Sequence, residues 1–469
     1  MGVKPSAILE PTCGRGTFLT AAAEAFPEVR DIIGIDINAQ YVAEARGVCG
    51  GRAQVEQGDF FRTDWLRILG RGVGSWLVLG NPPWVTNAEL GLLNSTNLPA
   101  KSNFQGHRGL DALTGKANFD ISEWMVLQQV GWLKERRGWI AMLMKTAVAR
   151  KILRLTWKRG EPVGRADIFA VDAMHHFGAA VNACLLVLPV QPSQPSRSCD
   201  VFDSLEDLEP TGTVGYHDGV LISDMDAFMA RRQLLGFNRD YIWRSGIKHD
   251  CTTVMDLTRS KDGGLVNGLG KVVEVEDAYL FPMFKSSDVA KEKRCANRMM
   301  IVPQQGIGED TCHIQRDAPR TWAYLCAHGE QLDGRRSVIY RSKPRFSIFG
   351  VGDYTFAPWK VAISGFYKIP CFVKVGPIGE KPVVFDDTVY FLPCRSEDEA
   401  DFVDSLVQSK PYSQLLRGMV FAADKRPITA EVLRRISLER VAHELGRGDR
   451  YAAFTRKKPA PQMELALGL

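Results

Sequence analysis

Over the N-terminal half of the chain, apolar positions occur in two patterns: short runs typical of strands, and the spacing typical of helices. Short apolar runs at 7–9 and 32–36 predict buried strands, and 54–59 is predicted as the third strand. Apolar positions at helical spacing over 18–26 and 39–46 predict the helices between them. Strands that alternate with helices in this way predict a parallel, doubly wound α/β sheet, whose ligands bind at the carboxyl ends of the strands.

The alternation continues to about residue 190, and its further elements are predicted as strands at 76–79, 139–144, 168–171 and 183–188 and helices at 119–133 and 145–159. The proline- and serine-rich segment 189–198 is typical of a linker. We therefore predict three parts: an α/β domain over 1–190, a linker with amphipathic bridging helices over 191–240, and a mixed α+β domain over 241–469.

The strand predicted at 76–79 ends in a glycine, an asparagine, two prolines and a tryptophan. The two prolines fix the backbone and remove two N–H donors, so the amide of Asn81 and the carbonyl of Pro82 lack local partners. These two oxygens can accept both hydrogens of an exocyclic amine, and Trp84 can stack on the planar base that carries it. The turn therefore predicts a site that grips an amino-bearing base.

Polar residues also end the other predicted strands, at the same edge of the sheet. The first strand ends in Glu10, and Gly14 and Gly16 then allow a tight turn and the close approach of a ligand to the backbone. Asp36 ends the second strand, where a carboxylate can accept hydrogen bonds from two ribose hydroxyls. An Asp-Phe pair at 59–60 ends the third strand, where the acid can accept from an adenine amine and the ring can flank the base.

The order of these motifs is glycine turn, ribose-binding acid, Asp-Phe and Asn-Pro-Pro-Trp. It resembles that of the class I S-adenosylmethionine-dependent methyltransferases. More narrowly, the chain resembles the γ-class amino-methylating DNA methyltransferases, in which a specificity domain follows the catalytic motifs. The resemblance covers residues 6–190, and residues 280–420 more loosely. It implies a Rossmann-like methyltransferase domain followed by a domain that recognises the DNA target.

The resemblance also implies roles for individual residues. Those implied to bind the cofactor, S-adenosylmethionine, are Glu10, Pro11, Thr12, Gly14, Gly16, Asp36, Ile37, Asp59, Phe60 and Asn81. Those implied for catalysis are Asn81, Pro82 and Trp84, with the target base stacked between Trp84 and Phe177. The implied reaction methylates the N6 amine of an adenine that is flipped out of double-stranded DNA.

The same resemblance implies a restriction–modification setting. A separate restriction endonuclease is the implied genetic partner, and a bacterial or archaeal cytoplasm is the implied location. No apolar run of about 18 residues occurs, so no membrane span is expected. Ten cysteines without a CxxC pair are expected to be reduced packing residues, and no metal site is expected.

The charge distribution favours contact between the C-terminal half and a polyanion. Residues 231–469 hold 37 Lys and Arg against 29 Asp and Glu, a balance of +8, and the remaining 22 and 25 give −3. The polar segment 85–118, rich in glycine and asparagine, is typical of a lid or a binding loop. The residues predicted to contact DNA are Lys101, Arg108 and Lys116 in that segment, and Arg341, Lys343, Arg345 and Lys360 in the C-terminal domain.

Several alternatives stay open at this point. Cytosine also presents an amine, although the N4-cytosine enzymes more often carry serine at the position of Asn81. The same turn would serve a methyltransferase of RNA or of a protein amide, and an inactive chain would serve as a DNA-binding specificity subunit. An NAD enzyme is less favoured, because Gly14 and Gly16 lack the third glycine of the dinucleotide fingerprint.

The chain departs from the family pattern in one respect. An aromatic–glycine element normally precedes the glycine turn and holds the methionine end of the cofactor. The nine residues before Glu10 contain no such element. Either the chain starts late, or another segment supplies that contact.

Overall fold

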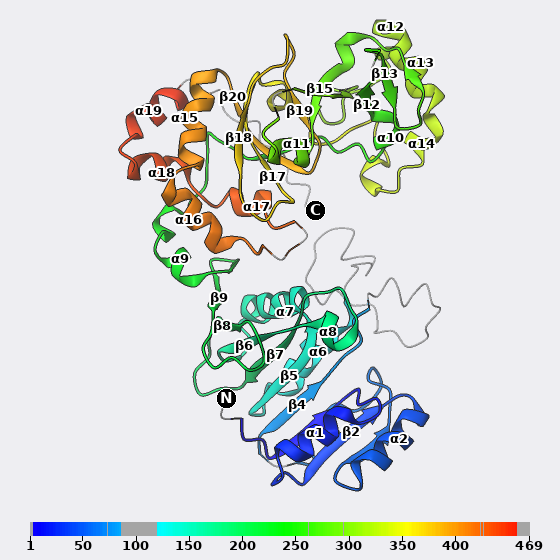
Figure 1. Ribbon diagram of the computed structural model, residues 1–469, viewed down its shortest axis with the longest axis vertical. Helices are drawn as coiled ribbons and strands as arrows, with labels where there is room; N and C mark the ends of the chain where they lie inside the picture. The colour runs from blue at the N-terminus through cyan, green and yellow to red at the C-terminus, as the bar shows by residue number, and fades with distance from the viewer. Residues whose placement is uncertain are drawn as a thin grey trace. The chain divides into compact units, whose positions relative to one another are not determined.

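The computed structural model describes residues 3–72, 74–85, 120–260, 262–293, 295–422, 424 and 426–456. It contains two compact units, which divide between Asp226 and Ala227 (Figure 1). This division lies within 191–240, the segment that the sequence predicts to join the two domains. Within the described residues, no helix combines the length and the apolar character that crossing a membrane requires.

The N-terminal unit is built on a ten-stranded sheet with the order β10-β9-β8-β6-β7-β5-β4-β1-β2-β3. Its strands are β1 (Ala7–Glu10), β2 (Asp31–Asp36), β3 (Gln54–Gln57), β4 (Trp76–Gly80), β5 (Gly138–Lys145), β6 (Ala166–Val171), β7 (Ala183–Val190), β8 (Ser198–Phe202), β9 (Gly212–His217) and β10 (Val220–Ile222). Pairing is parallel from β3 through β5, and β7 runs antiparallel to both β5 and β6. The predicted Rossmann-like fold class is therefore confirmed.

The helices of this unit include α1 (Thr17–Ala25), α2 (Ala39–Cys49), α3 (Trp65–Leu69), α6 (Ile121–Trp132), α7 (Thr146–Arg159) and α8 (Ala173–Phe177), and α9 (Met225–Met229) spans the division between the units. On one face of the sheet, Ile8, Ile32 and Leu77 form a buried cluster with Leu19 of α1 and Val42 of α2. The alternate strand residues point to the opposite face. Helices α6 and α7 pack against each other and against β5.

Two glycines allow the first helix to lie close to its neighbours. Gly16 precedes α1 with φ +85°, and a Cβ there would lie 3.0 Å from the Cβ of Ala45 in α2. Gly34 lies in β2, and a Cβ there would lie 2.4 Å from a methyl carbon of Leu19. A larger residue at either position would push α1 away from the sheet, together with the turn that precedes it.

The bridging helices predicted within 191–240 are wrong for residues 198–222, which contain β8, β9 and β10; helix forms later, at Met225–Met229 and Arg232–Leu234. The cause is a hairpin: Asp218 and Gly219 both have positive φ, +48° and +83°, and they connect β9 to β10. An Asp-Gly pair of this kind is typical of a two-residue turn whose twist matches that of the flanking strands. β8 then extends the sheet by pairing in parallel with β6.

The C-terminal unit contains two smaller sheets. The four-stranded sheet has the order β11-β20-β17-β18, and the six-stranded sheet has the order β14-β13-β12-β16-β15-β19. Their strands are β11 (Arg244–Ser245), β12 (Asp256–Arg259), β13 (Leu265–Asn267), β14 (Val272–Val273), β15 (Leu280–Phe284), β16 (Arg298–Ile301), β17 (Trp359–Ser364), β18 (Phe372–Val375), β19 (Val384–Phe385) and β20 (Val389–Cys394). The strand and helix mixture of this unit agrees with the predicted α+β class.

The helices of the C-terminal unit include α10 (Thr252–Met255), α11 (Ser286–Ala290), α12 (Ile314–Asp317), α13 (Pro319–Ala327), α14 (Gly329–Asp333), α15 (Glu397–Val407), α16 (Lys410–Met419), α17 (Ala430–Leu433), α18 (Leu438–Glu444) and α19 (Gly448–Thr455). Helix α15 packs on β17 and β18 of the four-stranded sheet. The aromatic residues Phe385 and Phe391 belong to a cluster that β15, α11 and β17 share.

Candidate active site

A cavity of about 360 Å³ opens at the carboxyl ends of the first strands of the N-terminal sheet. The chain leaves β1 for β2 on one side and returns to β4 on the other, and ligands of open α/β sheets bind at such a reversal of strand order. The residues that line the cavity are Pro11, Thr12, Asp36, Ile37, Gly58, Phe60, Phe61, Asn81, Pro83, Val85, Ile121 and Met125. Six of the residues predicted to bind the cofactor are therefore brought together here.

Asp36 is fixed by two backbone donors. The N–H of Gly14 donates to one carboxylate oxygen and the N–H of Asn38 donates to the other, each at 2.8 Å. Gly14 has φ +50°, which turns its N–H towards the end of β2. Each carboxylate oxygen can accept further hydrogen bonds, so Asp36 can still receive a pair of vicinal hydroxyls.

Glu10 lies beneath the glycine turn and is only 2% exposed. Burial and the nearby charge of Asp36 raise the pKa of its carboxyl well above the ordinary value. Its Oε2 has no hydrogen-bond partner among the described residues. A Cβ at Gly80 would lie 3.4 Å from the Cγ of Glu10, so the tips of β1 and β4 are adjacent. A buried, unsatisfied carboxylate of this kind is suited to pairing with a cationic ligand group.

Aromatic side chains form one wall of the cavity. The ring of Phe60 packs against Trp65 and Trp132, with centroid distances of 5.2 and 5.4 Å. The indole N–H of Trp65 donates to the carbonyl of Phe60 at 2.8 Å, which fixes that backbone. Asp59 is not among the lining residues. Its Oδ1 accepts the N–H of Phe61 at 2.9 Å, and its Oδ2 lies 3.5 Å from the guanidinium of Arg62.

The Asn-Pro-Pro-Trp turn is tied to β5. Asn81 is exposed to the cavity and Pro82 is buried beneath it. The indole N–H of Trp84 donates to the carbonyl of Leu143 at 3.2 Å, and the ammonium of Lys145 donates to the carbonyl of Trp84 at 2.8 Å. The turn is therefore held at its tryptophan by both the side chain and the backbone.

Lys145 also joins this turn to the start of α6. Its Nζ lies 2.9 Å from Oδ2 of Asp120, a carboxylate whose side chain is 7% exposed. The other oxygen of Asp120 accepts the N–H and the hydroxyl of Ser122, at 3.1 and 2.6 Å. We call Trp84, Asp120 and Lys145 the clasp. The sequence analysis did not predict the clasp. The one feature of the sequence that indicated it was Lys145, directly after the buried strand predicted at 139–144.

Phe177 lies at the end of α8 and is 52% exposed. Its ring centroid is 6.2 Å from that of Trp84, and the two ring planes meet at 78°. Two rings that sandwich a base must be nearly parallel, and this edge-to-face contact is not. The pairing of Phe177 with Trp84 around a target base stays a prediction.

The predicted DNA contacts have different outcomes. Lys101, Arg108 and Lys116 lie outside the described residues. Arg341, Lys343 and Arg345 are exposed, and Arg345 pairs with Asp333 at 3.1 Å.

The prediction for Lys360 is wrong. Its side chain is 1% exposed, and its ammonium donates to the carbonyl of Ala357 at 2.6 Å. Burial lowers the pKa of Lys360 to about 7. Its strand β17 is covered by α15 and lies between β18 and β20, so this side chain points into the unit and away from any phosphate. Among the described residues, no group of three or more His, Cys, Asp or Glu is placed to hold a metal ion.

Comparisons with known proteins place the chain among methyltransferases. No protein-family model matches it. It is 42% identical to the type II methyltransferase M.NspV of Nostoc sp. (strain ATCC 29411 / PCC 7524) over 447 residues, which cover 94% of this chain and 93% of that protein. The fold is similar to that of the type IIL restriction-modification enzyme MmeI, solved in complex with DNA, with a TM-score of 0.56 at 12% identity. That similarity covers 91% of this chain and 62% of the MmeI chain.

Proposed function

Because the chain belongs to the type II methyltransferases of restriction–modification systems, we propose that it methylates the N6 amine of an adenine in double-stranded DNA. Its methyl donor is S-adenosylmethionine, the cofactor of this class. The observation that carries the proposal is the position of Asn81, whose amide opens onto the same cavity as the fixed carboxylate of Asp36.

The residues present in the cavity fit this donor. The carboxylate of Asp36 would accept hydrogen bonds from the two ribose hydroxyls of the donor. The unpaired Oε2 of Glu10 would accept a hydrogen bond from the ammonium of its methionine part. The rings of Phe60 and Phe61 would flank the adenine of the donor. When bound, the donor supplies a methyl group already activated on a sulfonium.

The residues of the turn would then orient the substrate amine. The amide oxygen of Asn81 and the carbonyl of Pro82 would each accept one amine hydrogen, which draws the nitrogen lone pair out of conjugation with the ring. These hydrogen bonds strengthen as the nitrogen gains positive charge, so they stabilise the transition state more than the ground state. Lys145 would maintain the turn in position through the carbonyl of Trp84.

Adenine is proposed over cytosine because the turn begins with asparagine, which the resembling adenine enzymes carry at this position. The amine of a paired base is buried in the duplex, so the base must be flipped out before the turn can contact it. A restriction endonuclease with the same target sequence, encoded as a separate chain, is the proposed genetic partner.

The test incubates the protein with methyl-labelled donor and with DNA, RNA or protein in separate reactions. We expect label in DNA alone, as N6-methyladenine after hydrolysis to nucleosides. Asn81→Ala should retain donor binding and lose most turnover, whereas Asn182→Ala, at an exposed asparagine of the same unit, should resemble the native protein. N4-methylcytosine as product would refute the choice of base, and an Asn81→Ala variant with the native rate would refute the mechanism.

A further inference from the structure

Three ring contacts lead from the Asn-Pro-Pro-Trp turn across the surface of α8. The ring of Trp84 meets that of Phe177 at a centroid distance of 6.2 Å. Phe177 in turn meets His176 at 6.0 Å, and His176 meets His175 at 4.9 Å. All three of these residues of α8 are exposed to water. We call Phe177, His176 and His175 the ring row.

The ring row stands on a short helix that is anchored at both ends. The carboxylate of Asp172 accepts the N–H of His175 at 2.9 Å, which caps the start of α8. At the other end, Gly178 has φ +64° and donates its N–H to the carbonyl of Met174 at 3.0 Å. Ala173 is buried, so the helix is also fixed to the unit beneath it. The exposed rings are thus presented by a supported segment.

The ring row lies at the same edge of the sheet as the cavity. Strand β6 runs in the direction of β5, because both are antiparallel to β7, and α8 follows the carboxyl end of β6. Met174 and Val181 of the same segment are 55% and 40% exposed, and large apolar side chains left in water favour a contact surface. The row begins at Trp84, three residues after Asn81. Its occupant therefore lies next to the base that Asn81 is proposed to bind.

A base that enters the cavity remains joined to its neighbours through the sugar–phosphate backbone. The nucleotides on either side of it must therefore pass close to the Asn-Pro-Pro-Trp turn. Their bases and sugars can pack on aromatic side chains, and their phosphates accept hydrogen bonds from N–H donors. A neutral imidazole offers both a flat face and one N–H. The chemistry of the ring row thus suits the DNA strand that carries the target base.

We propose that His175 and His176 bind the nucleotide next to the target base on the same strand. The ring of His176 packs on the sugar and base of that nucleotide, and a ring N–H of His175 donates to its phosphate. Phe177 keeps the place predicted for it beside the target base, so the ring row extends the contact by one nucleotide. This inference rests on the proposed function.

The test combines histidine substitutions with the change of a single phosphate in the DNA. Duplexes with the mapped recognition sequence carry one uncharged methylphosphonate, on either side of the target nucleotide or at the matching places of the complementary strand. The variant His175→Ala with His176→Ala should lower kcat/KM on unmodified DNA about tenfold, because a ring contact and a hydrogen bond are both lost.

The double variant should be insensitive to one of the phosphates beside the target. At that place the methylphosphonate should lower kcat/KM of the native protein about threefold or more and should cause no further loss in the double variant, because the contact is already absent. In the complementary strand the losses should multiply. His175→Asn, which keeps an N–H donor, should retain more of the rate than His175→Ala.

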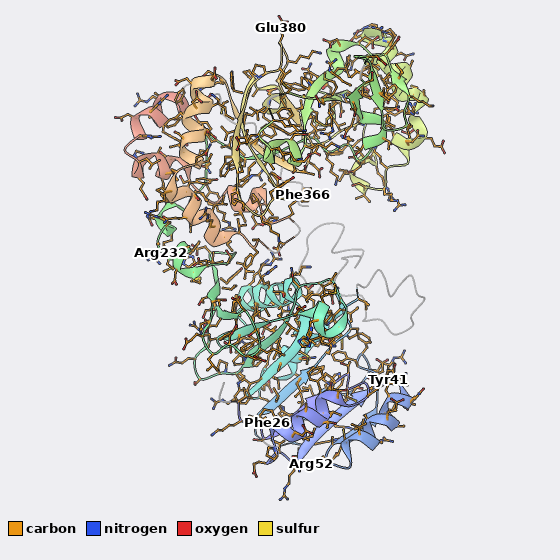
Figure 2. The ribbon with its side chains drawn as sticks, viewed as in Figure 1. Phe26, Tyr41, Arg52, Arg232, Phe366 and Glu380 are labelled. Atoms are coloured by element: carbon orange, nitrogen blue, oxygen red, sulfur yellow. The ribbon has the colours of Figure 1, made fainter. Side chains whose placement is uncertain are left out.

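Two control variants should behave as the native protein on every duplex. His217→Ala removes a histidine of β9 whose side chain is 37% exposed. Arg52→Ala removes a cation that precedes β3, and Figure 2 shows Arg52 at the end of the N-terminal unit away from α8. A loss in either control equal to that of the double variant would overturn the proposal in favour of a general effect on DNA affinity.

Losses that multiply at both places beside the target would also overturn it, since the histidines and the phosphates then act separately. A double variant with the native rate would do the same, as would one that loses donor affinity or melting temperature. A native protein that labels no DNA refutes the proposed function, and the role of the ring row with it. N4-methylcytosine as product refutes only the choice of base, because the ring row contacts the neighbouring nucleotide.

Discussion

Replacement of Lys145 by methionine tests whether the clasp positions the catalytic turn. Methionine keeps the length and apolar character of the lysine stem and removes its ammonium, which donates to the Trp84 carbonyl and to Asp120. Oδ1 of Asp120 would still accept two hydrogen bonds from Ser122, whereas Oδ2 would lose the ammonium of Lys145. The change therefore releases the turn while the start of α6 keeps its cap.

The size of the effect follows from the bond that is lost. A hydrogen bond from a charged donor contributes about 1.5–3 kcal/mol. The side chain of Lys145 is 30% exposed, so water replaces part of the contact with Asp120, and we count only the bond to Trp84. If that energy is lost from the positioned transition state, kcat falls roughly ten- to a hundredfold. Donor affinity should be unchanged, because Lys145 is not among the residues that line the cavity.

The assay combines single-turnover methylation, donor titration by calorimetry and thermal unfolding. Lys145→Arg should recover part of the rate, since a guanidinium can also reach two acceptors. Lys151→Met, at an exposed lysine on α7, is the control and should be neutral. The reasoning is refuted if Lys145→Met turns over at the native rate, or if its loss of rate is matched by an equal loss of donor affinity or of folded protein.

Two further substitutions test the assignments of Asp36 and Lys360. Asp36→Ala should weaken donor binding about tenfold or more by calorimetry, because it removes the acceptor for the ribose hydroxyls. Asp31→Ala, at the exposed start of the same strand, should leave donor affinity unchanged. Unchanged affinity in Asp36→Ala would exclude Asp36 from the site. Burial lowers the pKa of Lys360 from 10.5 to about 7, so the unfolded chain binds more protons in that interval and stability should rise with pH across it. Lys360→Met should lack this rise and Lys291→Met should keep it, and a melting temperature with the same pH slope in both variants would contradict the burial.

The parts of the site that could be predicted from sequence are those fixed by the order of strands and motifs along the chain. Parallel strands all end at one edge of their sheet, so the residues after them must converge, and Asp36 and Asn81 do line one cavity. The Asp218-Gly219 pair is typical of a two-residue hairpin turn, and the prediction of helices in this segment overlooked it.

The parts that could not be predicted depend on contacts between distant segments. Lys360 alternates with apolar neighbours like many surface strand residues, and its burial follows from the pairing of β17 with β20 and β18. Lys145 and Asp120 are 25 positions apart, and only the folded sheet brings the end of β5 to the start of α6. Charge in the sequence indicated a DNA-binding half, but it could not distinguish an exposed Arg341 from a buried lysine.

The clasp has a consequence for how enzymes of this type can diversify. The backbone N–H of Ile121 donates to the carbonyl of Val85 at 3.0 Å, and Lys145 fixes Trp84 and Asp120 beside them. Val85 and Ile121 are therefore held together by contacts that they and the clasp make. A substitution between these two residues, outside the clasp, would leave those contacts in place, so Asn81 and Pro82 would keep their support from β5.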